Sequence, residues 1–277
     1  PRCAPTIRSP SQVLGPVMRL FHFFTYYRSL GGVQSILKRH HASDAKRGHD
    51  PDFLFAFEPD DFDEPDIAGL GYGGGHSIRS MRAKFAKHSG RFTDSVAVCH
   101  NMWGLQFFAD LMPAERRVGL LHSDWTGLRP HLETQRGLLD GVLCVSNALV
   151  ELVSDCLPDL AKANRVALIP YPIDGLAAMP ERTPLAKRTV VIGWIGRMQT
   201  EQKRIDRLPG LARALESAGI DFRLELLGDG PRQAWLEQQL PGGRTVFHGR
   251  KSGDEYWSVL RGWDFITSVS DYEGLPI

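Results

Sequence analysis

Residues 189–208 read TVVIGWIGRMQTEQKRIDRL, and they decide how the whole chain is organised. The apolar run at 189–195 has the length and the β-branched content of a buried strand. A helical pattern begins soon afterwards, near Ile205. The stretch before the strand, 170–187, is rich in proline and weakly patterned, which is typical of a linker. A second strand–helix unit therefore begins close to residue 188.

Short apolar runs alternate with helix-like stretches on both sides of this linker. Strands are expected before it at 18–24, 52–57, 95–99, 117–122, 141–145 and 165–169, and after it at 189–195, 222–228, 245–249 and 264–270. Helices are expected between them at 33–42, 77–88, 104–111, 128–139, 147–155, 205–217, 232–239 and 254–261. Such alternation predicts an α/β protein in which helices cover parallel sheets.

The predicted organisation has four parts. Residues 1–17 form an unpatterned tail, 18–172 a first Rossmann-like domain, 173–187 the linker and 188–277 a second Rossmann-like domain. The second domain holds only about 90 residues, whereas α/β domains usually have roughly 100–150. We therefore expect the second domain to be incomplete.

Composition narrows the class of protein. Hydrophobic residues make up 42% of the chain and charged residues 23%, as in ordinary globular proteins. The net charge of +1 offers no general attraction for nucleic acid. The four cysteines are far apart, and Cys99 and Cys144 fall in apolar runs, which indicates buried thiols of a reducing compartment. With neither a membrane-length apolar run nor a signal-peptide pattern, we expect a cytoplasmic protein.

Two loops at predicted strand ends are candidate ligand sites, because ligands of such sheets bind at the carboxyl ends of the strands. Gly31 and Gly32 precede a helix, so their bare N–H groups could face an anion, or the pair could simply form a tight turn. In the second domain, Gly196 and Arg197 follow a strand and Lys203 comes six residues after Arg197. Two cations there suit a diphosphate, although a solvated basic helix start would have the same sequence.

The motifs form an ordered series that is similar to one known family. From the N-terminus they are GGVQS (31–35), HSD (122–124), CVSNALVELV (144–153), IPYPID (169–174), GRMQTEQK (196–203), LLGDGP (226–231), FHG (247–249) and SDYEGLP (270–276). The series resembles the retaining GT-B glycosyltransferases of group 1, or family 4. The resemblance implies two Rossmann-like domains facing a cleft, and transfer of a sugar from a nucleotide-sugar with retention of anomeric configuration.

The resemblance also implies roles for residues of the second domain. Arg197 and Lys203 would hold the donor diphosphate, beside Gly196. Glu273 would contact sugar or ribose hydroxyls, and Arg250 would lie near the base. Of these residues, Arg197, Lys203 and Glu273 are expected to be catalytic.

Other roles fall on the first domain. Gly31 and Gly32 would approach the donor phosphates. His122 would face the transferred sugar and is also expected to be catalytic, with a role as a proton-transfer base as a lesser alternative. Where many relatives have Asn-Gly before the linker, this chain has Tyr171-Pro172, and where Lys-Gly is common it has Lys203-Arg204. These departures leave the donor open among UDP-, GDP- and ADP-sugars, and the acceptor open among glycans, lipid-linked sugars and small molecules.

No cofactor or metal is expected, because Arg197 and Lys203 can stabilise the leaving diphosphate. A competing interpretation is a metal site at the D-x-D of Asp61 and Asp63, a pattern that holds a metal in the other glycosyltransferase fold. The alternative is that this segment is a solvated acidic loop. The G-x-G-x-x-G at 69–75 follows Pro65 and Asp66 in place of a strand, so it fails as a dinucleotide site.

Two further expectations concern surfaces and ends. The basic amphipathic helix within 76–91 could touch an anionic membrane or a lipid-linked acceptor, or be an ordinary surface helix. In the resembling family Glu273 is the first of two carboxylates separated by seven residues, and the second would lie beyond Ile277. We therefore expect a fragment of a longer enzyme, with weak or no turnover. A catalytically inactive nucleotide-sugar-binding or scaffold protein is the alternative function.

Overall fold

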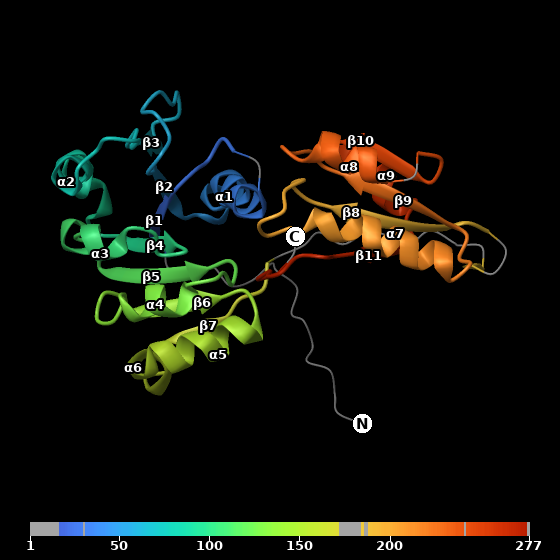
Figure 1. Cartoon of the computed structure of the whole chain (residues 1–277). Coiled ribbons are helices and arrows are strands. Elements are labelled where there is room, and N and C mark those ends of the chain that lie inside the picture. Colours follow the sequence, from blue (N-terminus) through green and yellow to red (C-terminus); the bar gives the residue numbers. More distant parts are fainter. Residues whose placement is uncertain (1–16, 30, 172–183, 186–187, 241, 276–277) are drawn as a thin grey trace. The chain divides into compact units, whose positions relative to one another are not determined.

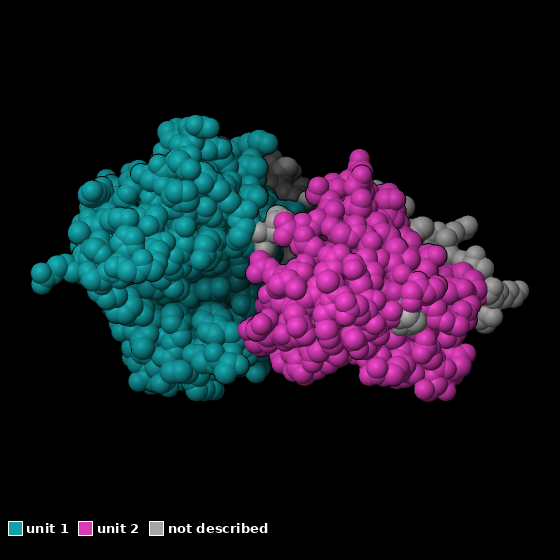
Figure 2. All heavy atoms as spheres, turned by 45° about the horizontal axis from the view of Figure 1, so that its top comes forward, with its two compact units in different colours: residues 1–173, 274–277 teal, residues 174–273 magenta. Residues whose placement is uncertain are grey.

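The computed structural model describes residues 17–29, 31–171, 184–185, 188–240 and 242–275. The predicted tail at 1–17 and the linker at 173–187 lie almost entirely outside the described residues. The chain divides into two compact units, which are described separately here (Figure 2). Unit 1 comprises Pro1–Ile173 with Gly274–Ile277, and unit 2 comprises Asp174–Glu273.

Unit 1 is built on a seven-stranded parallel sheet in the order β3-β2-β1-β4-β5-β6-β7 (Figure 1). Its strands are β1 (Arg19–Phe24), β2 (Asp50–Phe55), β3 (Ile67–Gly69), β4 (Val96–His100), β5 (Arg116–Leu121), β6 (Gly141–Cys144) and β7 (Val166–Leu168). Its α-helices are α1 (Gly32–Ser43), α2 (Ile78–Ala86), α3 (Leu105–Phe108), α4 (Leu128–Glu133), α5 (Asn147–Cys156) and α6 (Pro158–Lys162). Three short 3₁₀ turns accompany them, η1 (Ala45–Arg47), η2 (Ser89–Phe92) and η3 (Ala109–Leu111).

Unit 2 is built on a four-stranded parallel sheet in the order β10-β9-β8-β11. Its strands are β8 (Val190–Ile195), β9 (Phe222–Leu227), β10 (Thr245–Gly249) and β11 (Phe265–Thr267). Its helices are α7 (Leu208–Ser217), α8 (Gln233–Gln239) and α9 (Gly253–Arg261), with a 3₁₀ turn η5 (Ile205–Arg207) before α7. The edge strand β11 leaves Phe265 and Ile266 52% and 65% exposed.

The predicted strands are all present, and the α/β class with two Rossmann-like sheets is confirmed. One strand was missed: β3 precedes the 69–75 glycines where the sequence analysis placed no strand, and it pairs with β2. Its three residues follow directly on Pro65 and Asp66 and are too few to show a periodicity. Four predicted helices are shorter than expected. The helix at 128–139 ends at Glu133, and the helix at 104–111 is divided into α3 and η3. In the same way, the helix at 205–217 begins with the 3₁₀ turn η5, and the helix at 77–88 is reduced to Ile78–Ala86.

Each unit has its own apolar core. Stacked and edge-on phenylalanines dominate that of unit 1, including Phe23, Phe85, Phe92 and Phe108, all at most 1% exposed. Trp194 and Trp263, at 1% and 2% exposure, are the largest buried side chains of unit 2. These cores hold the carboxyl ends of the strands, and therefore the loops that follow them, in fixed positions.

Candidate functional site

The strand orders locate the point in each sheet where ligands of this architecture bind. In unit 1, chain order reverses between β1 and the neighbouring β4, and in unit 2 between β8 and β11. In open α/β sheets, ligands bind outside the carboxyl ends of the strands at such a switch point. The loops after β1, β4, β8 and β11 are therefore the places to examine.

In unit 2 the switch point brings together a cation and a carboxylate that are 70 residues apart in sequence. Lys203, in the loop after β8, donates to Glu273, which follows β11, with a distance of 2.5 Å between Nζ and Oε1. The two side chains are 23% and 22% exposed. The backbone supports the pair, because Asp271 N donates to Gln202 O at 3.0 Å and Gln202 Nε2 donates to Tyr272 O at 3.2 Å.

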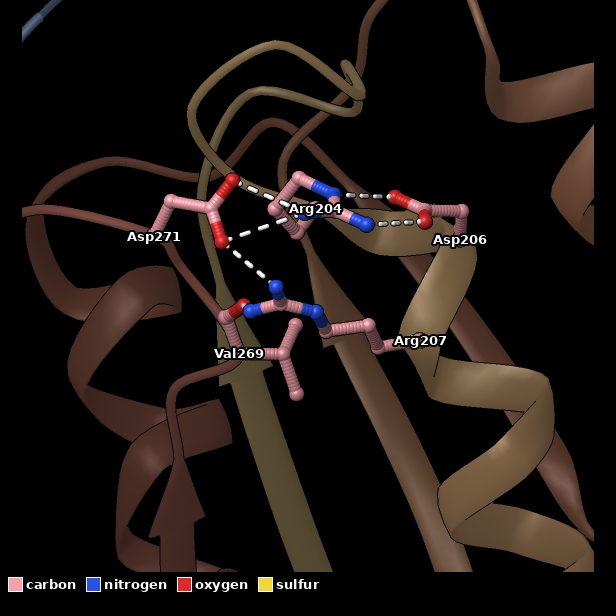
Figure 3. A network of polar contacts seen from close by, with 5 residues as sticks. All are labelled: Arg204, Asp206, Arg207, Val269 and Asp271. Atoms are coloured by element: carbon pink, nitrogen blue, oxygen red, sulfur yellow. Dashed lines mark hydrogen bonds and ion pairs between the residues drawn. The ribbon is translucent and has the colours of Figure 1, made fainter. Parts of the chain in front are cut away.

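A charged network next to the pair holds the two loops together (Figure 3). Arg204 donates to both carboxylate oxygens of Asp271, at 2.8 and 3.1 Å, and to Asp206 at 2.9 and 3.1 Å. Arg207 donates to Asp271 at 2.5 Å and to the carbonyl of Val269 at 2.9 Å. The hydrogen bonds that Arg204 donates to Asp206 and Asp271 raise its pKa above the ordinary value. The network lies directly after Lys203 in one loop and directly before Glu273 in the other, so it sets their separation.

Arg204 explains one departure from the family pattern. Its φ is +47°, in the left-handed region that glycine adopts without steric cost. The family commonly has glycine at this position, whereas here an arginine accepts the strained backbone and its guanidinium bridges two aspartates. The contacts of the Arg204 side chain therefore hold a turn that glycine would form without strain.

The loop after β9 packs against the loop after β8. A Cβ at Gly228, where φ is +126°, would lie 2.1 Å from the carbonyl oxygen of Gly196, so only glycine fits there. Met198 N donates to Asp229 O at 2.7 Å, and Arg232 N donates to Met198 O at 3.0 Å. The GDGP turn therefore shapes the Gly196–Met198 backbone, which carries Arg197.

Arg250 follows β10 and donates to Asp229 at 2.6 Å, so it lies at the end of the neighbouring strand in the same sheet. The structure thus brings Gly196, Arg197, Lys203, Arg250 and Glu273 to the carboxyl-terminal side of one four-stranded sheet. Lys203 and Glu273 are in contact, whereas Arg250 pairs with Asp229.

In unit 1, the two glycines lie at the start of α1. Gly31 is the N-cap and Gly32 the first helical residue, and no side chain in the described part of the chain caps this end. The buried carboxylate of Glu58 accepts from the backbone N–H groups of Tyr27 and Arg28, at 2.8 and 2.9 Å, and so shapes the loop that leads to the glycines. Sequence reasoning did not identify Glu58.

His122 lies at the end of a chain of buried histidines. β1 and β4 pair His22 with Val98, and β4 and β5 pair His100 with Leu120. His100 lies two residues after Val98, the partner of His22, and His122 lies two residues after Leu120, the partner of His100. A two-residue step along a strand keeps the side chain on the same face of the sheet. The alternation therefore places His22, His100 and His122 in a diagonal row.

Hydrogen bonds join the row into a continuous chain. His22 Nδ1 is 2.9 Å from His100 Nε2, and His100 Nδ1 is 2.7 Å from His122 Nε2. His122 Nδ1 is hydrogen-bonded to the hydroxyl of Tyr171, and the two rings are stacked with an interplanar angle of 12°. At the other end, Asp44 Oδ2 lies 3.8 Å from His22 Nε2 and 2.8 Å from His40 Nδ1. Sequence reasoning found only His122, although two histidines closing the neighbouring runs VAVCH and LLH were a usable signal.

The electrostatics keep this chain neutral. Burial lowers the pKa of His122 to about 3, and it lowers the pKa of His100 and His22 as well. Burial raises the pKa of the Tyr171 hydroxyl. Burial alone would raise the pKa of Asp44, but the neighbouring His22 and the hydrogen-bonded His40 hold it well below its usual range. At neutral pH the chain therefore consists of uncharged rings that end at an ionised carboxylate.

Two residues with strained backbone directly follow β4, and the first of them contacts the end of β5. Asn101 and Met102 have φ values of +50° and +53°, which is uncommon for residues other than glycine. Asn101 Oδ1 accepts from the backbone N–H of His122 at 2.9 Å, and its carbonyl accepts from His131 Nε2 at 3.0 Å. The strained turn thus fixes the position of His122.

Metal-binding geometry occurs in a different place from the D-x-D motif. In the part of the chain that the structure describes, one group of His, Cys, Asp or Glu atoms is close enough to share an ion: His22, His40 and Asp44. Asp61 instead pairs with Arg28 at 2.7 Å. The D-x-D interpretation therefore receives no support from the geometry.

The basic helix α2 uses several of its charges internally. Arg82 donates to both carboxylate oxygens of Asp110, at 2.8 and 2.6 Å, and Lys84 donates to the Leu70 carbonyl at 3.3 Å. Ile78 is 46% exposed. Among the described residues, no helix is long and apolar enough to cross a membrane. Contact between residues 76–91 and a membrane surface remains a prediction.

Comparisons with known proteins were made at the levels of sequence and structure. No protein-family model matches the chain, and no curated protein matches it by sequence. Solved structures do match: the lipopolysaccharide outer core galactosyltransferase WaaB is 16% identical, with a TM-score of 0.66, over 94% of this chain and 76% of that one. The chain has the GT-B glycosyltransferase fold.

Two further structures show the same fold. The pneumococcal O-GlcNAc transferase GtfA, solved with UDP and GlcNAc, is 9% identical with a TM-score of 0.64, over 93% of this chain and 80% of that one. TarM is 17% identical with a TM-score of 0.53, and there the match covers 70% of this chain but only 41% of the other. At these identities the likeness concerns the fold.

Proposed function

We propose that this protein is a glycosyltransferase that moves a sugar from a nucleotide-sugar to a hydroxyl group of a carbohydrate, lipid-linked or small-molecule acceptor, with retention of anomeric configuration. The observation that carries the proposal is the Lys203–Glu273 pair at the switch point of the unit 2 sheet. A cation for a diphosphate and a carboxylate for sugar or ribose hydroxyls are the groups that a nucleotide-sugar requires.

The leaving nucleotide explains the cations. Breaking the bond between the sugar and the diphosphate develops negative charge on the leaving oxygens. Neighbouring loops hold the backbone of the loop after β8, so Arg197 and Lys203 are already at this end of the sheet when the charge develops. Gly196 allows close backbone approach, and Arg250 is the proposed contact near the base. On unit 1, the uncapped start of α1 at Gly31 and Gly32 offers N–H groups of the kind that bind phosphate.

The buried histidine chain bears on the mechanism. A general base should have a pKa near the working pH, and burial lowers the pKa of His122 to about 3. His122 is therefore a neutral residue whose two ring nitrogens are hydrogen-bonded to His100 and Tyr171, on the side of unit 1 where the resemblance places the transferred sugar. We favour direct front-face transfer, in which an oxygen of the departing phosphate takes the proton of the acceptor hydroxyl. This mechanism uses Arg197 and Lys203 for charge stabilisation and needs no metal ion.

A turnover panel tests the proposal. Purified chain is incubated with UDP-, GDP- and ADP-sugars, with mixed glycan and lipid-linked acceptors, and release of the nucleoside diphosphate is measured. We expect slow acceptor-dependent release with one nucleotide series, in keeping with the weak turnover expected of this chain. Binding of a nucleotide-sugar without turnover in any series would favour the inactive, scaffold alternative, and absence of binding would refute both.

A further inference from the structure

The hydrogen-bond chain behind His122 has a direction. A neutral imidazole carries one N–H and one lone pair, so each ring donates on one side and accepts on the other. Both ring nitrogens of His100 and of His122 are hydrogen-bonded, and His22 has one hydrogen-bonded nitrogen and one that faces the carboxylate of Asp44. The N–H groups of the three rings must therefore all be directed the same way along the chain. There are two possibilities: protons directed toward Asp44, or protons directed toward Tyr171.

The environment of His22 selects one of them. Its Nε2 is buried, has no hydrogen-bond partner among the described residues and lies 3.8 Å from Asp44 Oδ2. An N–H at this nitrogen is attracted to the ionised carboxylate, whereas a lone pair is repelled by it. Asp44 cannot turn away, because the same oxygen accepts from His40 Nδ1 at 2.8 Å. His22 therefore carries its proton on Nε2.

The other protons follow in sequence. His22 Nδ1 then accepts from His100 Nε2–H, and His100 Nδ1 accepts from His122 Nε2–H. His122 Nδ1 is left with a lone pair, so Tyr171 donates its hydroxyl proton to it. The Tyr171 oxygen retains its own lone pairs and has no proton left to donate.

We infer that Asp44 orients this chain so that Tyr171 presents its hydroxyl oxygen solely as an acceptor, for a hydrogen bond from a hydroxyl group of the sugar substrate. Tyr171 follows β7 and is half-buried, and its ring is stacked on His122, the residue at the end of β5. Asp44, His22 and His100 are positioning residues that act through His122. The sugar as the ligand rests on the proposed function; the direction of the chain does not.

Tautomer measurement tests the direction without any substrate. In chain with ¹⁵N-labelled histidine, long-range ¹H–¹⁵N spectra assign each ring, and His122 should carry its proton on Nε2. Asp44→Asn replaces one oxygen by an NH₂ group that can donate to His22 Nε2, which lets the chain reverse, so the His122 proton should move to Nδ1. Asp66→Asn is the matched control, since Asp66 pairs with His41 at 3.2 Å and His41 is not part of the chain.

Several results would overturn the inference. They are a proton on His122 Nδ1 in the parent chain, no change in a folded Asp44→Asn variant, or stoichiometric Zn²⁺ binding with His22 Nε2 as a ligand. The parent spectrum decides the matter even if Asp44→Asn fails to fold.

The sugar contact has its own test. Tyr171→Phe should weaken sugar binding roughly 2- to 12-fold, the value of one hydrogen bond, with KM affected more than kcat. Unchanged sugar binding in Tyr171→Phe would refute the contact. If the chain turned over no nucleotide-sugar but the tautomer still switched, the proposed function would fail while the chain's direction would stand.

Discussion

The Lys203→Met substitution removes the ammonium at the switch point of unit 2 while keeping most of the side-chain volume. The ion pair with Glu273 is partly exposed, at 23% and 22%, so its loss should cost about 1 kcal/mol or less of stability. The melting temperature should accordingly fall by no more than about 2–4 °C. A hydrogen bond from a charged donor to a diphosphate is worth about 1.5–3 kcal/mol, which corresponds to a roughly 10- to 150-fold loss of affinity.

The assay is isothermal titration of UDP, GDP and ADP into the purified chain, with thermal unfolding measured in parallel. Lys251→Met is the matched control, because Lys251, two residues before α9, pairs with Glu255 of α9 at 3.1 Å and has no proposed ligand role. The control should keep wild-type affinity. If Lys203→Met bound nucleoside diphosphate within threefold of the parent chain, Lys203 would not be a phosphate ligand.

Three further predictions concern packing, pH and metals. Gly193→Ala places a Cβ 1.9 Å from Trp263 Cε3, so it should destabilise the protein by about 1–3 kcal/mol or more in urea unfolding; Gly210→Ala, with open space around it, should not, and equal effects would contradict the packing argument. The pKa of His122 is about 3 when folded and ordinarily about 6.5, so the unfolded chain binds more protons between these values. Stability should be highest above pH 6.5 and fall below it, and His122 alone should contribute about 1.4 kcal/mol per pH unit to the loss, a contribution that a folded His122→Asn variant should remove. EDTA should leave the initial transfer rate nearly unchanged, and abolition with rescue by manganese would instead show that transfer requires a metal ion.

The sequence was sufficient for the fold because its signals are local. Each long strand is an apolar run flanked by turn residues, so the alternation of strands and helices could be predicted on both sides of the linker. β3 was missed because three residues carry no periodicity and Pro65 appeared to exclude a strand. The proximity of Lys203 to Glu273 was expected only from the family resemblance, since it depends on β11 pairing with β8.

The histidine chain could not be predicted in the same way. Whether His22, His100 and His122 share a face depends on the register of β1, β4 and β5, which a sequence with weak alternation does not specify. Tyr171 lies outside every predicted strand and was noticed only as a departure from the family pattern. The sequence could not decide whether His122 acts as a base. The direction of its pKa shift follows from its burial, which only the structure shows.

Glycosyl transfer itself is tested most directly by following the anomeric carbon. The chain is incubated with ¹³C-labelled nucleotide-sugar of the series that it binds, together with the acceptor panel, and the one-bond C1–H1 coupling of any new glycoside is read by NMR. We predict slow consumption of donor and a product with the same anomeric configuration as the donor. An inverted product would contradict retention, and a donor that is bound but never consumed with any acceptor would contradict the assignment as a transferase.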